Sequence, residues 1–274
     1  MIDVNRTIDI MGIVNLTDDS YFAESRCGDI DAAIERTRQL LDEGATIIDV
    51  GACSTRPGAL PVGEDEEWNR LEPFLCAFVA EFPDVRLSID TYWSSVVRRA
   101  YALVGDFIVN DISAGEADGR MLSTVGELGL EYVAMHMRGN SLSMQSLTDY
   151  DSVTDDVFAY FQKFSQRAEK VGIRKWILDP GFGFAKTIDQ NYQLLRELDT
   201  FNNMICTDGS APRLLVGLSR KSMIYKRFNI TPEEALPATQ VLHLKSLMAG
   251  ADILRVHDVA EAVRTVDLYR ILFL

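Results

Sequence analysis

Residues 231–256 read TPEEALPATQVLHLKSLMAGADILRV, and this stretch contains the repeating unit of the whole chain. The four residues 231–234 are typical of a helix start, with a capping hydroxyl, a proline at the first helical position and acids in the first turn. A helical pattern follows over residues 235–249, and Gly250 indicates its end. The apolar run 253–256 then predicts a buried strand.

The same alternation of apolar runs and helical patterns continues from end to end. Continuous apolar runs are typical of parallel strands that are buried on both faces. They occur at residues 8–14, 46–50, 87–89, 107–109, 132–135, 176–178, 214–216 and 253–256. Helical patterns lie between them, for example at 30–43, 64–81, 155–172 and 235–249, and the last segment, 259–274, is also helical in pattern. Eight such units predict an α/β fold, a (β/α)8 TIM barrel. No linker or change in composition divides the chain, so residues 1–274 are expected to form a single domain.

Composition and charge exclude several classes of function. The 27 basic and 41 acidic side chains give a net charge of −14, which repels polyanions, so no nucleic acid and no anionic membrane is expected as a partner. The net charge does not exclude a small anionic ligand, because local charges determine such a site. No secretory signal and no transmembrane run is visible. Four scattered cysteines without a Cys-x-x-Cys pair are typical of free thiols in a reducing compartment, so a cytoplasmic location is expected.

Polar residues are concentrated where the predicted strands end, which is where TIM barrels carry their catalytic groups. Any one of them could instead cap a helix or a turn, but so many at one face of a barrel indicate a site. They are Asn15, Asp49, Asp90, Asn110, Asp111, His136, Asp179, Ser219, Arg220, Lys221, Arg255 and His257.

Two kinds of chemistry are represented among these strand ends. Asp90, Asn110 and Asp179 can accept hydrogen bonds from a flat heterocycle that is rich in N–H groups, and Asp90 can stabilise positive charge on it. A basic group comes from the last two units, where barrels often bind phosphate. A solvated basic patch is the alternative interpretation of that second group.

Eight motifs in this order resemble the dihydropteroate synthases, which are pterin-binding TIM-barrel enzymes. The resemblance runs from about residue 11 to residue 260. Each motif is weak alone, and the ordered set is specific. The motifs are residues 15–22 (NLTDDSYF), 54–59 (STRPGA), 88–91 (SIDT), 109–112 (VNDI), 135–137 (MHM), 179–184 (DPGFGF), 217–222 (GLSRKS) and 255–259 (RVHDV).

The resemblance implies a transferase of folate biosynthesis that forms a homodimer and uses Mg²⁺ as its cofactor. Such an enzyme condenses (7,8-dihydropterin-6-yl)methyl diphosphate with 4-aminobenzoate and releases 7,8-dihydropteroate and diphosphate. The loops at residues 15–26 and 53–63 are similar to the mobile lids of the family.

The resemblance also assigns roles to individual residues. Catalysis falls to Asp90 and Lys221, and Asn15 is expected to bind the metal and the diphosphate. The pterin, diphosphate and aminobenzoate contacts fall to Thr55, Arg56, Asp90, Asn110, Met135, Asp179, Phe184, Lys221, Ser222, Arg255, Val256 and His257. Within this set, Arg255 and His257 are expected at the diphosphate, and Arg56 and Ser222 near the aminobenzoate.

The sequence departs from the family pattern in several places, among them the Gly-Gly that often ends the first loop and is absent here, and two alternative functions stay open. Asp18 stands where proline is usual, Cys53 where glutamate is common, and Ala185 where glycine is common. A pterin-binding methyltransferase acting on a methylated folate shares the barrel and the pterin acids but has no need of the phosphate-binding cluster. A non-catalytic pterin-binding paralogue with altered lids is supported only by Asp18 and Cys53.

Overall fold

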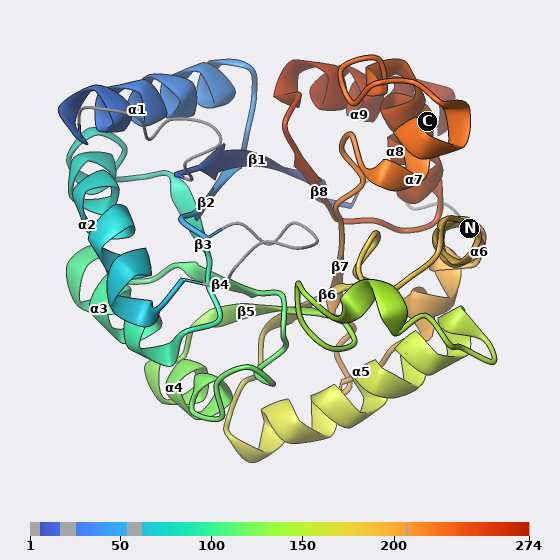
Figure 1. Ribbon diagram of the computed structural model, residues 1–274, viewed down its shortest axis with the longest axis horizontal. Helices are drawn as coiled ribbons and strands as arrows, with labels where there is room; N and C mark the ends of the chain where they lie inside the picture. Colours follow the sequence, from blue (N-terminus) through green and yellow to red (C-terminus); the bar gives the residue numbers. More distant parts are fainter. Residues whose placement is uncertain (1–5, 17–25, 54–61, 207, 274) are drawn as a thin grey trace.

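The computed structural model describes residues 6–16, 26–53, 62–206 and 208–273, and its strands close into a parallel barrel. Each strand pairs with the next in chain order, and β1 also pairs with β8 (Figure 1). The strands are β1 (Asp9–Asn15), β2 (Ile47–Gly51), β3 (Arg86–Asp90), β4 (Ile108–Asp111), β5 (Glu131–Met135), β6 (Trp176–Asp179), β7 (Arg213–Val216) and β8 (Ile253–Val256). The predicted (β/α)8 barrel is confirmed.

Helices surround the barrel as an outer ring (Figure 1). The α-helices of the described residues are α1 (Arg26–Asp42), α2 (Glu64–Glu81), α3 (Ser94–Val104), α4 (Met121–Leu128), α5 (Val153–Lys170), α6 (Ile188–Arg196), α7 (Ser222–Phe228), α8 (Leu236–Met248) and α9 (Val259–Phe273). Short 3₁₀ helices lie at Met144–Ser146 and Leu198–Asn203. No helix in these parts of the chain is long and apolar enough to cross a membrane.

Helix α8 begins later than its capping sequence predicts. Thr231 and Glu234 do exchange the two hydrogen bonds of a capping box, but the bonds close a turn that precedes the helix. Pro237 has no N–H to donate to the carbonyl of Glu233, so the helix cannot extend back through that turn. The carbonyls of Pro232 and Glu233 accept hydrogen bonds from Arg220 Nη1 instead, at 3.0 and 2.9 Å.

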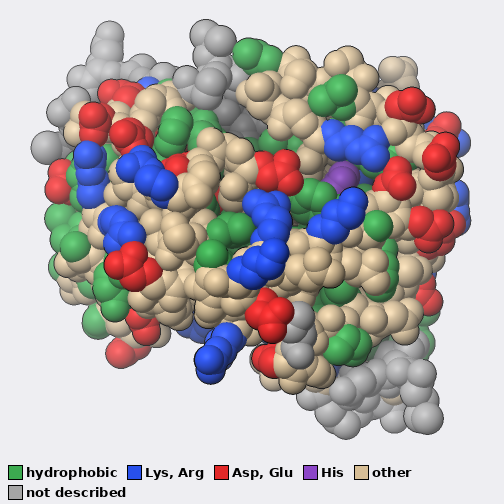
Figure 2. Space-filling view, turned by 90° about the horizontal axis from the view of Figure 1, so that it is seen from below, with side chains coloured by type: hydrophobic (Ala, Val, Ile, Leu, Met, Phe, Trp, Pro, Cys, Tyr) green, Lys and Arg blue, Asp and Glu red, His purple; other side chains and the backbone are tan. Residues whose placement is uncertain are grey.

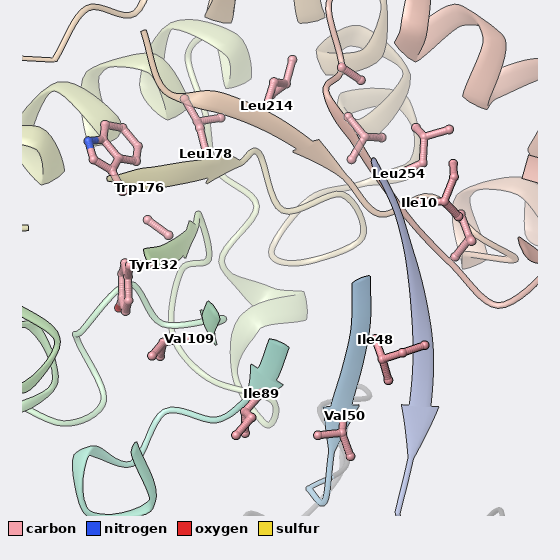
Figure 3. Packing of buried hydrophobic residues seen from close by; sticks show 14 of the residues in the cluster. Ile10, Ile48, Val50, Ile89, Val109, Tyr132, Trp176, Leu178, Leu214 and Leu254 are labelled. Atoms are coloured by element: carbon pink, nitrogen blue, oxygen red, sulfur yellow. The ribbon is translucent and has the colours of Figure 1, made fainter. Parts of the chain in front are cut away.

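Two apolar clusters fill the fold, one on each side of the barrel wall. The inner cluster consists of Met11, Ile47, Ile108, Val133, Ile177, Leu215 and Ile253. The larger outer cluster lies between strands and helices, and Figure 3 shows Tyr132, Trp176 and Leu214 on that side. Since side chains alternate along a strand, inward and outward positions follow directly from the register.

This alternation directs four polar side chains and the thioether of Met135 into one end of the barrel. Each lies two residues beyond an inner apolar residue of its own strand and therefore points to the same side. The pairs are Ile47 and Asp49, Ile108 and Asn110, Val133 and Met135, Ile177 and Asp179, and Ile253 and Arg255. The apolar layer forms the floor beneath these groups, at the end where the strands terminate.

Close packing of α4 against the end of α5 gives a first testable prediction. A Cβ added at Gly126 of α4 would lie 1.8 Å from the carbonyl oxygen of Val171. We expect Gly126→Ala to lower the free energy of unfolding by about 1–3 kcal/mol, because the backbone must move apart. Gly119→Ala is the matched control, since a Cβ there meets nothing within 4 Å. Equal denaturation midpoints for the two variants would contradict this packing.

Candidate active site

The carboxylate of Asp49 is fully buried and forms the centre of a hydrogen-bond network in the barrel mouth. Its Oδ1 accepts from Ser88 Oγ at 2.6 Å, and its Oδ2 accepts from Arg255 Nε at 2.6 Å. Asn110 Nδ2 lies 3.2 Å from both oxygens. Arg255 Nη2 also donates to Asp90 Oδ2 at 2.9 Å. Four strands, β2, β3, β4 and β8, are thereby joined at one point.

This network leaves specific oxygen atoms available to a ligand. Because Asn110 donates to Asp49, its carbonyl Oδ1 stays an open acceptor. Asp90 uses Oδ2 for Arg255, and Asp179 uses Oδ1 for the backbone N–H of Gly181 at 2.8 Å. In the described residues, the second oxygen of each of these carboxylates takes no hydrogen bond. The mouth therefore presents three acceptors from β3, β4 and β6.

Burial shifts the pKa values of both acids that line the mouth. It raises the pKa of Asp90 to about 7, although the charge of Arg255 opposes the shift. The negative charge of Asp49 adds to the increase. The pKa of Asp179 is also raised by burial and is held down by the charge of Lys221. Both carboxylates thus lie where a positive or N–H-rich ligand is favoured, since it would stabilise their ionised forms.

Lys221 lies just before α7 and points toward the loop that follows β6. Its Nζ donates to the carbonyl oxygen of Phe182 and lies 4.7 Å from the centre of the Phe184 ring. Burial lowers the pKa of Lys221 to about 8, while Asp179 and Asp90 raise it. The ammonium and the half-buried Phe184 ring therefore belong to the same mouth as the acceptors.

The basic residues expected beside phosphate occupy different environments. His257 is exposed at the rim, with Nδ1 3.1 Å from Ser219 Oγ. Arg220 forms a bidentate ion pair with Asp258, in which both N–O distances are 2.8 Å. Its Nη1 donates to the two carbonyl oxygens before α8. Arg220 therefore ties loops together, and the basic groups left for a ligand in this region are Lys221, Arg255 and His257.

The remaining expected site residues divide into three groups. Met135 is buried at the end of β5, whereas Asn15 at the end of β1 and Ser222 at the start of α7 are half-buried. Val256 is fully buried and packs in the outer cluster, so its side chain faces away from the mouth. Thr55 and Arg56, like Asp18, lie outside the described residues.

Two residues of the site received no role from the sequence. The sequence shows Asp49 as a polar residue near a strand end. Its position two residues after the inward-facing Ile47 could have indicated that it points into the mouth. Lys186 is almost fully buried behind the mouth, 3% exposed, in a stretch without any periodic pattern. Only the folded loop reveals it, because its partners come from two different strand ends.

The charge of the mouth differs from that of the outer surface. Figure 2 shows acidic and basic side chains interspersed over one side of the molecule, without a large field of basic residues. The net charge of −14 is a property of the whole chain and does not describe the local charge of the barrel mouth. An anion would be attracted locally, by Lys221 and Arg255 at the end of the barrel.

The chain matches a family model described as pterin binding enzyme over residues 11–257. The dihydropteroate synthase of Escherichia coli (strain K12) is 41% identical over 256 residues, which cover 93% of this chain and 88% of that protein. A Yersinia pestis dihydropteroate synthase with a sulfonamide drug complex superimposes with a TM-score of 0.88 and 36% identity, covering 98% of this chain and 95% of that one.

A second solved structure extends the likeness to a complex with a small molecule. The Xanthomonas albilineans dihydropteroate synthase with 4-aminobenzoic acid gives a TM-score of 0.87 and 34% identity, covering 98% of this chain and 94% of that one. These relatives are synthases, so the methyltransferase alternative has no support among them. The chain belongs to the pterin-binding enzymes, in the dihydropteroate synthase family of folate-synthesis transferases.

Proposed function

We propose that this chain joins 4-aminobenzoate to (7,8-dihydropterin-6-yl)methyl diphosphate and releases 7,8-dihydropteroate and diphosphate. The observation that carries the proposal is the barrel mouth itself. Three oxygen acceptors, on Asp90, Asn110 and Asp179, share it with two cations, on Lys221 and Arg255. One end of the mouth suits an N–H-rich ring and the other suits an anionic leaving group.

The pterin ring is assigned to the three acceptors. Its ring N–H and amino groups are donors, and each finds a carboxylate or amide oxygen that the network has already oriented. Met135, which is 3% exposed, lines the same end of the mouth with an adaptable apolar side chain. The Phe184 ring, which lies beneath the Lys221 ammonium, offers a flat surface to the heterocycle.

The diphosphate is assigned to Lys221, Arg255 and His257. Arg255 is anchored by Asp49 through Nε and by Asp90 through Nη2, so its Nη1 is the donor left for phosphate oxygen. Lys221 approaches from the adjacent loop, and His257 stands exposed at the rim. Lys221 and Arg255 neutralise the negative charge that collects on the leaving group as its bond breaks. Desolvation and the charge of Arg255 lower the pKa of His257 to about 4, so its ring contributes a hydrogen bond as a neutral group.

The reaction then proceeds without a covalent bond to the protein. The C–O bond between the pterin methylene and the diphosphate breaks, and its electron pair leaves with the diphosphate. Asp90 stabilises the positive charge that spreads over the pterin ring. The amine nitrogen of 4-aminobenzoate attacks the methylene carbon, and its excess proton is lost to solvent.

Mg²⁺ is the proposed cofactor, with Asn15 as its protein ligand. Asn15 supplies one hard oxygen donor, half-buried at the end of β1. The described residues contain no cluster of three His, Cys, Asp or Glu side chains that could hold a metal by themselves. Mg²⁺ usually keeps several waters and binds through substrate phosphates, so a single protein oxygen fits this ion. When bound, it would neutralise charge on the diphosphate.

The aminobenzoate is assigned to Ser222 and Arg56, and Thr55 is assigned a contact with the substrate. Ser222 opens α7 beside Lys221, so this substrate would approach the pterin methylene from the side of β7. Thr55 and Arg56 are proposed on the motif that they share with the family, within the loop of residues 53–63. A guanidinium suits the carboxylate of the substrate.

A homodimer in the cytoplasm is proposed as well. Apolar side chains stand exposed on α8 and α9, namely Val241, Met248, Leu268, Ile271 and Leu272, and such a patch suits a second copy of the chain. Cys76 and Cys206 form no disulfide, in line with a reducing compartment. Sedimentation should show a dimer for the wild type and a monomer for Ile271→Asp; a wild-type monomer would refute the dimer.

The reaction is tested with purified protein, Mg²⁺, the pterin diphosphate and labelled 4-aminobenzoate. We expect labelled dihydropteroate and diphosphate in equal amounts. Pterin binding without product formation would instead support the non-catalytic paralogue. The same protein with EDTA should lose turnover, and added Mg²⁺ should restore it.

The diphosphate assignment makes a separate prediction. Lys221→Ala and Arg255→Ala should each lower the affinity for the pterin diphosphate about tenfold to a hundredfold. The reason is that a hydrogen bond between charged groups contributes about 1.5–3 kcal/mol. Binding of 6-hydroxymethyl-7,8-dihydropterin, which lacks the diphosphate, should change much less. Calorimetry with both ligands measures the difference. Lys226→Ala, an exposed lysine of α7, is the control. Equal losses for both ligands would refute the assignment.

A further inference from the structure

Lys186 is a buried lysine that no part of the proposed reaction uses. It is 3% exposed, and lysine is almost never buried to this extent unless its charge is paired. Its Nζ lies 3.0 Å from His136 Nδ1, 3.0 Å from the carbonyl oxygen of Gly181 and 3.1 Å from that of Phe184. An ammonium has three N–H donors, and each of them meets one acceptor.

Desolvation makes this burial costly. It lowers the pKa of Lys186 to about 7, and the charges of Lys221 and Arg138 lower the pKa further, while Asp179 raises it. His136 is also buried and its pKa is held far below the usual value, so its ring is neutral and can accept a hydrogen bond at Nδ1. The His136 and Tyr160 rings pack in a T-shaped arrangement, with centroids 4.9 Å apart.

The loop that wraps around Lys186 is conformationally demanding. Gly181, Gly183 and Ala185 all have positive φ, at 72°, 84° and 50°. A Cβ at Gly181 would lie 2.0 Å from the carbonyl oxygen of His136, so the loop packs directly on β5. Ala185 adopts a left-handed conformation that glycine takes freely and that costs an L-residue free energy. Such a loop needs contacts that hold it in place.

The same loop carries the contacts that Asp179, Phe182 and Phe184 make in the mouth. The N–H of Gly181 orients the Asp179 carboxylate, the carbonyl of Phe182 accepts from Lys221, and the Phe184 ring lies beneath the Lys221 ammonium. Lys186 donates to the carbonyl oxygens of Gly181 and Phe184, which stand at the two ends of the segment that makes these contacts.

We propose that Lys186, supported by His136, is a positioning residue that fixes the β6–α6 loop so that Asp179 and Phe184 meet the pterin ring. Lys186 acts through the loop and does not touch the substrate. The proposal rests on the proposed function, because it assigns the pterin to the end of the mouth that this loop forms.

The test compares Lys186→Met with Lys170→Met, an exposed lysine at the end of α5. Methionine keeps the length of the side chain and removes all three donors. We expect Lys186→Met to raise KM for the pterin diphosphate and Kd for 6-hydroxymethyl-7,8-dihydropterin at least tenfold, with KM for 4-aminobenzoate within twofold of the wild type. A purely structural role would reduce the active fraction and leave both KM values unchanged. Lys170→Met should match the wild type.

A second pair of variants decides the matter if Lys186→Met does not fold. His136→Asn retains an acceptor oxygen near the Nδ1 position, and His136→Leu removes it. We expect the pterin affinity to fall in His136→Leu and to be largely restored in His136→Asn. Equal pterin affinity in these two folded variants, or in Lys186→Met and Lys170→Met, would overturn the proposal. Absence of product with the wild type would refute the proposed function instead, whereas the binding measurements with 6-hydroxymethyl-7,8-dihydropterin would still test Lys186.

Discussion

Asp90→Asn should lower kcat by about 10²–10³-fold, the usual effect of removing one preorganised group that stabilises charge in a transition state. Asparagine keeps the shape of the side chain and one oxygen acceptor, so the affinity for the pterin diphosphate should stay within a few-fold of the wild type. The carboxylate charge matters most when the C–O bond has broken and the ring is cationic. Single-turnover kinetics separates the two effects, with Asp189→Asn, an exposed acid on α6, as the control.

The Asp90 carboxylate also makes both kcat/KM and stability depend on pH. Burial raises the pKa of Asp90 to about 7, so below this pH the group is protonated in the free enzyme and cannot stabilise a cation. We expect kcat/KM to rise with pH through about 7, and we expect Asp90→Asn to lose this rise. The folded state binds the proton more tightly than the unfolded chain, so the contribution of Asp90 to stability falls as pH rises from 3.8 to about 7.

Two results would contradict the role of Asp90. An unchanged kcat in Asp90→Asn would show that its charge does not act on the transition state. A loss of pterin affinity with kcat unchanged would indicate that the residue only binds the ring. The pH dependence of unfolding, measured for both proteins by urea denaturation, checks separately that Asp90 titrates where its burial predicts.

Asp49→Asn is expected to give the largest loss of stability, about 3–5 kcal/mol in the free energy of unfolding, as is usual when one member of a buried ion pair is removed. Arg255 would keep only Asp90 as a charged partner. The Arg255 Nε would then face a neutral amide in place of a carboxylate, so the guanidinium would be held less firmly and the pterin diphosphate should bind more weakly than in the wild type. Urea unfolding and calorimetry measure the two effects.

A double-mutant cycle separates the ion pair from the rest of the network. If Asp49 acts chiefly on Arg255, then Asp49→Asn should cost much less in an Arg255→Met background than in the wild type. Additive effects of the two substitutions would mean that Asp49 acts through Ser88 and Asn110 instead. Since the charge of Asp49 raises the pKa of Asp90, Asp49→Asn should also move the rise of kcat/KM to lower pH.

Most of the fold was predictable because it depends on local patterns. All eight apolar runs are strands of the barrel, and their ends carry the polar residues that meet in the mouth. The main difference from the sequence prediction concerns the start of α8, where the capping box closes a turn that precedes the helix. The sequence does contain the reason, Pro237, but its effect depends on Arg220 binding the freed carbonyls.

The neighbours Arg220 and Lys221 show where sequence reasoning ends. Both are basic residues of one motif, yet Arg220 has a positive φ of 51° and turns to Asp258, while Lys221 turns into the mouth. No local pattern distinguishes them, because the partner of each side chain comes from a different part of the chain. Arg255 and Val256 differ for a local reason instead, because neighbouring residues of a strand point to opposite faces, so Val256 faces the helices and Arg255 the barrel mouth.

The sequence by itself determined the barrel, the inward face of each strand and the family, because strand periodicity and ordered motifs are local properties. The tertiary structure alone decided which polar groups touch. Asp49 and Arg255, 206 positions apart, meet within 2.6 Å, and Lys186 finds its acceptors on two different strand ends. Burial and charge pairing depend on such long-range contacts, and they set the pKa values of Asp90, Lys221 and Lys186.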